Sequence, residues 1–183
     1  MRFETTPIPD VRIIIPNRIG DARGYFMESF KDAWFREHIA DVTFVQDNQS
    51  LSAQTGTIRG LHYQDAPMEQ GKLVRCLKGA IFDVAVDIRP GSNTFGQWYG
   101  VELSADNGWQ LWVPAGFAHG FCTLVPDTEV FYKVTNPYSR EHDRGIAFDD
   151  PDIGIRWPVD PADAVLSDKD RAQPRLMSLK EPK

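Results

Sequence analysis

The sequence KLVRCLKGAIFDVAVDIR, residues 72–89, decides the fold. Its two apolar-rich runs, 72–77 and 81–89, are joined at Lys78-Gly79-Ala80, and such runs on either side of a short glycine turn predict two β-strands. Because side chains alternate along a strand, the apolar residues at 82, 84, 86 and 88 share one face. Asp83 and Asp87 share the other face. The segment therefore predicts antiparallel β-structure with one apolar face and one face that carries two carboxylates.

Short runs of the same kind recur along the chain. We expect strands over residues 11–15, 72–77, 81–89, 95–103, 109–113 and 129–135, and another strand entered through the turn at 114–121. A turn at 20–24 leads into an alternating strand in which Phe26, Glu28 and Phe30 would share one face. Residues 31–39 form the best helical candidate. We therefore predict an all-β, antiparallel sandwich or barrel with few short helices, whose mouth is the natural place for a small ligand.

Composition restricts the class of protein. For 183 residues we expect a single domain spanning 1–183. The net charge of −6 argues against a protein that coats nucleic acid, and no run approaches the roughly 20 apolar residues of a membrane helix. Cys76 and Cys122 lie in apolar runs, which favours buried thiols in a reducing cytosol over a disulfide scaffold. The N-terminus lacks the apolar stretch of a signal peptide, so we expect a cytoplasmic protein.

Residues 57–64, TIRGLHYQ, are where we expect the chemistry. The guanidinium of Arg59 is the preferred fork for a phosphate or carboxylate, and the imidazole of His62 is suited to moving protons near neutral pH. Strict alternation would put positions 59 and 62 on opposite faces of a strand, so both could not line one pocket. Gly60 can resolve this conflict as a bulge or a turn residue. We therefore predict irregular backbone at residues 58–60.

A metal site is a natural alternative. The motif Pro114-Ala115-Gly116-Phe117-Ala118-His119 resembles the second motif of the cupins, Pro-x-Gly-x-x-His. The first cupin motif supplies a His-x-His pair, but this chain has His62-Tyr63-Gln64, so one imidazole is missing. A triad of His62, His119 and Glu69 could be drawn only by ignoring Gln64. We expect a cupin-type barrel without a metal.

Without a metal, the polar side chains suit proton transfer at carbon. Removing a proton next to a carbonyl needs a base, and the resulting enolate oxygen needs positive charge or hydrogen-bond donors. His62 is the candidate base, Lys72 and His119 could face the oxyanion, and Tyr132 could return a proton. Taken singly, Lys72 is more simply an exposed strand lysine and Tyr132 a core aromatic. Residues 44–50, FVQDNQS, are more simply a polar loop than a row of contacts to a base or sugar.

The ordered motifs together resemble the dTDP-4-dehydrorhamnose 3,5-epimerase family over nearly the whole chain. The stretches that carry the resemblance are residues 21–26, 46–50, 58–64, 70–75, 83–89, 92–96, 114–121 and 166–170. The resemblance implies a cupin-type jelly roll that needs no metal or other cofactor. It also implies a homodimer that exchanges N-terminal strands. Its substrate would be dTDP-4-keto-6-deoxy-glucose, in the route to dTDP-L-rhamnose.

The resemblance also implies catalytic roles. His62 matches the base, and Asp170 matches the carboxylate that holds this base in a dyad. Tyr132 matches the acid that supplies a proton from the opposite face, and Lys72 and His119 match the groups that stabilise the enolate. The C4 ketone acidifies both C3 and C5, so one site can invert both carbons.

Further positions match substrate contacts of the family. Arg59 matches the pyrophosphate ligand, and Phe26 and Tyr138 are candidates to stack on thymine. The other matched nucleotide or sugar contacts are Arg23, Glu28, Gln46, Asn48 and Lys169. Because early strands are exchanged in relatives, residues 23–28 are expected to serve the partner's site. The chain departs from the family at Asp143, where the family usually has Glu, and this shorter side chain changes one contact.

Three other functions stay open at this point. A related enzyme could epimerise only C3 or only C5, a cupin oxygenase would depend on iron, and a non-catalytic module would only bind the sugar nucleotide. The combination of His62, Tyr132 and Asp170 argues against the binding module, because simple binding does not require it.

Overall fold

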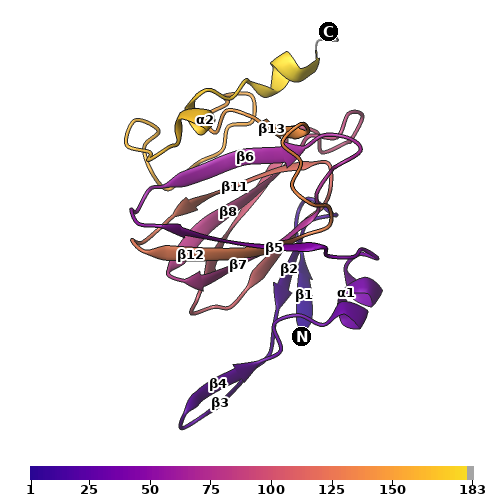
Figure 1. Cartoon of the computed structure of the whole chain (residues 1–183), viewed down its shortest axis with the longest axis vertical. Helices are drawn as coiled ribbons and strands as arrows, with labels where there is room; N and C mark the ends of the chain where they lie inside the picture. The colour runs from indigo at the N-terminus through magenta and orange to yellow at the C-terminus, as the bar shows by residue number, and fades with distance from the viewer. Residues whose placement is uncertain (181–183) are drawn as a thin grey trace.

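The computed structural model describes residues 1–180, whose strands form two antiparallel sheets packed face to face (Figure 1). Within this part of the chain, the six-stranded sheet has the order β1 (Arg2–Thr5), β2 (Arg12–Ile15), β10 (Gln110–Val113), β7 (Lys72–Lys78), β12 (Thr128–Val134), β5 (Gln46–Ser52). The five-stranded sheet has the order β13 (Asp143–Gly145), β6 (Ile58–Gln64), β11 (Phe117–Thr123), β8 (Ala80–Asp87), β9 (Trp98–Ser104). The predicted all-β class is confirmed.

A separate hairpin projects from this sandwich, at the bottom of Figure 1, and is formed by β3 (Arg18–Asp21) and β4 (Gly24–Met27). We call it the arm. Two short helices, α1 (Asp32–His38) and α2 (Asp168–Arg171), and a 3₁₀ helix (Leu176–Lys180) complete the described elements. Within residues 1–180 every helix is too short or too polar to cross a membrane.

The space between the two sheets is apolar at one end and polar at the other. Alternation sends every second side chain of each strand into this space. The apolar end is filled by Ile13, Ile15, Val74, Leu111, Val113 and Val130 of the six-stranded sheet and Ile81, Ala85, Leu103, Phe117 and Phe121 of the other. The polar end lies where β5, β6 and β12 run, and it contains the cavity described below.

Both outer faces of the sandwich are partly covered. Phe35 of α1 packs on Leu73 and Trp112, on the outside of the six-stranded sheet. Chain after β13 covers the outside of the five-stranded sheet, where Ile146 and Leu176 pack in one cluster with Leu61 of β6 and Val84 and Val86 of β8. This covering brings α2 against β6 (Figure 1).

The two strands expected within residues 72–89 are present as β7 and β8, but they lie in opposite sheets and pair with other strands, not with each other. Val84 and Val86 pack on the outer face, whereas Asp83 and Asp87 point the other way and are fully buried. Asp87 accepts hydrogen bonds from the Arg89 guanidinium and from the hydroxyls of Ser92 and Thr94, and so holds the loop after β8. Burial alone would raise the pKa of Asp87, but these donors together lower it far below its usual range.

Two local predictions are wrong. Residues 46–50 lie in strand β5, which pairs with β12, and not in a polar loop. Their inward side chains are polar because they line the cavity, so the strand lacks the apolar alternation by which strands are recognised. The strand expected through Phe26, Glu28 and Phe30 ends at Met27, because β4 pairs only with β3. Phe30 instead joins the aromatic cluster around α1.

Candidate active site

A β-bulge in β6 brings Arg59 and His62 to the same cavity. His62 pairs with His119 of β11 and Arg59 pairs with Phe121, so three steps along β6 match two steps along β11. The extra residue reverses the alternation, as expected for a bulge. Gly60, at the bulge, has a φ of +139°. The predicted irregular backbone at 58–60 is confirmed, and both side chains line one hollow.

The polar end of the sandwich holds two hollows of about 220 and 260 Å³ that share His62, Lys72, Tyr132 and Lys169. Their remaining lining residues are Ser50, Arg59, His119, Phe121, Ser167 and Asp170 on one side and Gln46, Asn48, Tyr63, Gln64, Gln70, Tyr138 and Asp143 on the other. The two hollows therefore make one site with two lobes. His62 belongs to the five-stranded sheet and Tyr132 to the six-stranded sheet, so they face the site from opposite walls.

His62 and Asp170 are in direct contact, although 108 positions separate them in the sequence. His62 Nε2 lies 2.5 Å from Asp170 Oδ1, and the Ser167 hydroxyl donates to Asp170 Oδ2 at 2.8 Å. Burial would raise the pKa of Asp170, but the hydrogen bond and charge of His62 and the Ser167 hydroxyl lower it below its ordinary value. An ionised, anchored carboxylate orients the imidazole and stabilises its protonated form.

Lys72, which is buried, and Tyr132, which is half-buried, are polar groups of the opposite wall. Lys72 is 7% exposed, and its Nζ donates to the backbone oxygen of His62 at 3.2 Å. Burial lowers the pKa of Lys72 to about 8, although Asp83 and Asp143 oppose this change. Burial raises the pKa of Tyr132, so this phenol keeps its proton at neutral pH and can act as an acid.

His119 stands beside His62 on the neighbouring strand and is 6% exposed. Its Nε2 lies 2.8 Å from Oδ1 of Asp83, which is fully buried on β8. Burial lowers the pKa of His119, and the charge and hydrogen bond of Asp83 oppose this effect. The site thus contains a second carboxylate–imidazole pair.

The outer lobe of the site is organised around Tyr138. Its backbone N–H donates to Gln46 Oε1 at 3.0 Å, and Gln46 in turn donates to Asn48. Its hydroxyl donates to Asp143 Oδ2 at 3.1 Å, and Lys169 binds the same oxygen. The shorter Asp143 therefore still reaches both neighbours, and the ring of Tyr138 is left 58% exposed at the mouth.

Arg23, Phe26 and Glu28 do not reach this site within their own chain. Arg23 lies at the turn of the arm and Phe26 on β4, and within residues 1–180 the 90% exposed Arg23 side chain pairs only with Asp21. Phe26 is 70% exposed. These three residues and the cavity are therefore separate in the described monomer.

The residues present do not fit a cupin metal centre. Gln64, at the position of the missing imidazole, uses its amide on the backbone oxygens of Met68 and Pro137 and on the N–H of Ser139. His62 and His119 are each bonded through Nε2 to a carboxylate. Within residues 1–180, no group of three or more His, Cys, Asp or Glu side chains could hold a metal ion.

Comparison with known proteins identifies the family of this chain. The model of the family described as dTDP-4-dehydrorhamnose 3,5-epimerase matches residues 5–178. The chain belongs to this epimerase family. It is 60% identical, over 98% of its length and 91% of the relative's, to the dTDP-4-dehydrorhamnose 3,5-epimerase of Sinorhizobium fredii. The family is one of isomerases, and the predicted enzyme class is confirmed.

Two solved structures of the epimerase family have the same fold. The enzyme of Legionella pneumophila, in complex with dTDP-4-keto-L-rhamnose, is 46% identical with a TM-score of 0.93, covering 98% of this chain and 94% of that one. The enzyme of Bacillus anthracis, with TDP and PPi bound, is 49% identical with a TM-score of 0.90, covering 95% and 98%.

Sequence reasoning missed two residues that support this epimerase site. Asp83 gave no local signal, because an acid opposite the apolar face of a strand is ordinarily expected in solvent. It faces the interior here because Val84 and Val86 pack outward, under the C-terminal segment. Gln64 was noticed only as a missing metal ligand, whereas its amide ties the chain around Tyr138 to β6 through Ser139.

The bulge gives the first testable prediction. A Cβ on Gly60 would lie 2.5 Å from Gly120 Cα and 3.0 Å from the His119 oxygen, at a φ that side chains avoid. Gly60→Ala should therefore lower the free energy of unfolding by about 3 kcal/mol and greatly reduce turnover. Chemical denaturation measures the first effect. The matched control is Gly20→Ala, whose Cβ meets only an ordinary contact at 3.6 Å. A Gly60→Ala variant as stable and active as wild type would contradict the bulge.

Proposed function

We propose that the chain inverts C3 and C5 of dTDP-4-dehydro-6-deoxy-D-glucose to give dTDP-4-dehydro-L-rhamnose. The observation that carries this proposal is the opposition of a carboxylate-anchored base, His62, to a protonated phenol, Tyr132, across one cavity. Lys72 lies in the same cavity as a buried cation. The dTDP-4-keto-L-rhamnose bound by the Legionella relative supports the substrate class.

The mechanism consists of two proton transfers at each carbon. His62 takes the proton from C5 or C3, and the electron pair of that C–H bond moves through the enolate to the C4 oxygen. Lys72 stabilises the negative oxygen, in a cavity where burial strengthens the interaction. Tyr132 then gives its proton to the carbon from the opposite face, which inverts the centre. The tyrosinate regains a proton and His62 loses one, so the site is ready for the second carbon.

The nucleotide end of the proposal uses the cations at the site's edge. Arg59 lines the cavity with its Nε bound to the Ser52 hydroxyl and its Nη2 to the Leu51 oxygen, which holds the fork in place for a diphosphate. Lys169 adds a second cation, and the exposed ring of Tyr138 offers a stacking surface for thymine.

Solvent deuterium exchange tests the reaction. With dTDP-4-dehydro-6-deoxy-D-glucose in D₂O, we expect label at both C3 and C5 by NMR. His62→Ala should reduce incorporation at both carbons by roughly 100-fold or more, because one base serves both. Tyr132→Phe should block inversion through loss of the acid. His38→Ala is the matched control, since His38 stacks on Trp34 of α1.

The outcomes separate the alternatives. Label at one carbon only would replace the 3,5-epimerase with a single-carbon epimerase. Nucleotide-sugar binding without any label would indicate a binding module. Unchanged exchange in His62→Ala would contradict the mechanism. Stoichiometric iron that is lost together with activity on chelation would favour the oxygenase.

We also propose that the protein works as a homodimer in which each arm completes the partner's site. Ile19, Tyr25 and Phe26 of the arm are 58–70% exposed, and a two-stranded hairpin is marginal by itself. Exposed aromatic clusters of this kind mark interaction surfaces. A partner would cover them and would deliver Arg23 and Glu28, which have no role within their own chain's cavity.

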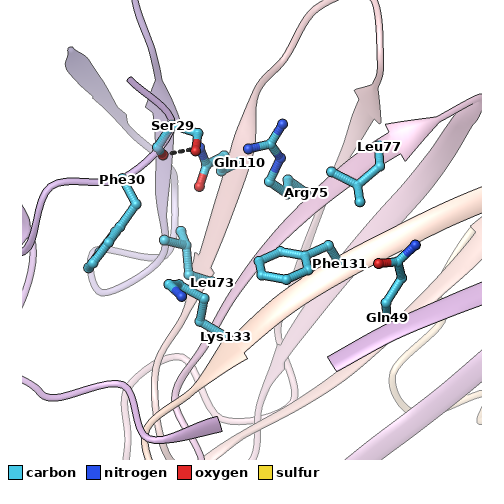
Figure 2. A pocket seen from close by; sticks show the side chains of 9 residues that line it. All are labelled: Ser29, Phe30, Gln49, Leu73, Arg75, Leu77, Gln110, Phe131 and Lys133. Carbon is cyan, nitrogen blue, oxygen red and sulfur yellow. Dashed lines mark hydrogen bonds between the residues drawn. The ribbon is translucent and has the colours of Figure 1, made fainter. Parts of the chain in front are cut away.

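A groove on the outer face of the six-stranded sheet supports the same proposal (Figure 2). Its volume is about 390 Å³, and it is lined by Ser29, Phe30, Gln49, Leu73, Arg75, Leu77, Gln110, Phe131 and Lys133. Phe131 and Lys133 are the outward neighbours of Tyr132, so this groove is backed by the catalytic strand β12. We propose that a second copy covers it, because Leu77 and the nearby Leu51 are exposed apolar residues.

Mixing two inactive variants tests the exchange of arms. His62→Ala has an intact arm but lacks the catalytic base in its cavity. The triple variant Arg23→Ala, Phe26→Ala, Glu28→Ala has an intact cavity but lacks the side chains of the arm. In co-refolded mixtures about half of the dimers are mixed, and one of their two sites is intact, so activity should return to about a quarter of wild type. No recovery would show that the arm serves its own chain. Full activity of the triple variant alone would show that it serves neither.

The cysteines support a cytoplasmic location, which we also propose. Cys76 and Cys122 are free, buried thiols, and burial raises the pKa of each to about 11. Such thiols are inert and are typical of reducing compartments.

We further propose a single domain, because both sheets share one interior. The last residues of this domain, 181–183, lie outside the described part of the chain.

A further inference from the structure

Asp83 is an exceptional buried group in this fold. It is 0% exposed, its Oδ1 lies 2.8 Å from His119 Nε2, and its Oδ2 has no hydrogen-bond partner within residues 1–180. Burying a carboxylate with a free oxygen is costly, so a buried group of this kind needs an explanation beyond packing. Asp87, on the same face of β8, shows the contrast, because both of its oxygens are bonded.

The contact with Asp83 decides which nitrogen of His119 carries hydrogen. A carboxylate can only accept, so Nε2 must be the donor. Burial lowers the pKa of His119, which keeps the ring neutral at pH 7 and leaves Nδ1 without a hydrogen. Nδ1 makes no hydrogen bond within the described chain. It is not fully buried, and the side chain lines the cavity. It is therefore an open acceptor.

Asp83 also acts on Lys72 across the cavity. Its charge is the largest influence that raises the pKa of Lys72 against burial. The ammonium uses one of its three donors on the His62 oxygen, so two remain for a ligand. His62, His119, Lys72 and Asp83 thus form one electrostatic group, and Lys169 and Asp143 are the further charges that act on Lys72.

We propose that Asp83 is a positioning residue that holds His119 as the neutral Nε2–H imidazole. His119 then accepts a hydrogen bond from a sugar hydroxyl through Nδ1, and Lys72 alone supplies positive charge at the enolate oxygen. This divides the roles of two residues that the family resemblance groups together. The inference rests on the proposed function, which it deepens.

NMR of the wild-type protein tests the tautomer without any assay of activity. In ¹⁵N-labelled protein at pH 7, we expect hydrogen on Nε2 of His119 and none on Nδ1, with His119→Gln used to assign the signals. Hydrogen on Nδ1, or on both nitrogens, would overturn the inference. This readout is separate from deuterium exchange, so a failure of the inference and a failure of the proposed function are distinguishable.

Asp83→Asn tests the consequence for catalysis. We expect kcat to fall about 10- to 100-fold, because an amide can donate to Nε2 and change the tautomer. We also expect the alkaline fall in kcat to begin at lower pH, because Lys72 loses its counter-charge. Asp87→Asn is the matched control: it should lower the melting temperature while the His119 tautomer and the alkaline limb stay unchanged.

Two results would overturn the inference at this stage. One is an Asp83→Asn enzyme with unchanged kcat and pH profile. The other is an Asp87→Asn enzyme whose tautomer and pH profile change equally, which would indicate a general effect of loosening β8. If Asp83→Asn does not fold, the wild-type tautomer alone decides.

Discussion

The single extra residue in β6 is the constraint on which this site depends. Without the register shift opposite His119 and Phe121, Arg59 would point to the outer face and the cavity would contain no guanidinium. The shift is permitted because Gly60 and Gly120 let the two backbones approach where a side chain would collide. One local irregularity thus places a guanidinium and an imidazole in the same cavity.

Burying polar groups in one half of the sandwich interior lowers the stability of the fold. Lys72, His119, Asp83 and Asp170 are all at most 7% exposed, and each charge removed from water must be compensated nearby. The compensation is paired: Asp170 with His62, and Asp83 with His119 and Lys72. The same burial that makes these groups costly keeps Tyr132 protonated and leaves Lys72 close to its titration range. The apolar end of the same interior supplies the core that such a site needs.

Sequence patterns predicted the parts of the fold whose side chains obey one periodicity. The two strands within residues 72–89 and the helix near 32–38 are of this kind, and the bulge followed from the conflict between positions 59 and 62. Strand β5 was not predicted, because its inward residues are polar and the apolar alternation is therefore missing. The contact between His62 and Asp170 could not be derived from local patterns, since it depends on how the covering C-terminal segment lies on β6; only the family resemblance paired them.

The most direct measurement is a crystal structure of this chain with dTDP bound. We expect the diphosphate to contact the Arg59 guanidinium and the shift between β6 and β11 to be retained. The β-phosphate, which carries the hexose in the substrate, should point toward His62. A diphosphate bound away from Arg59, or a regular β6 with Arg59 on the outer face, would contradict the claim that one bulge builds this site.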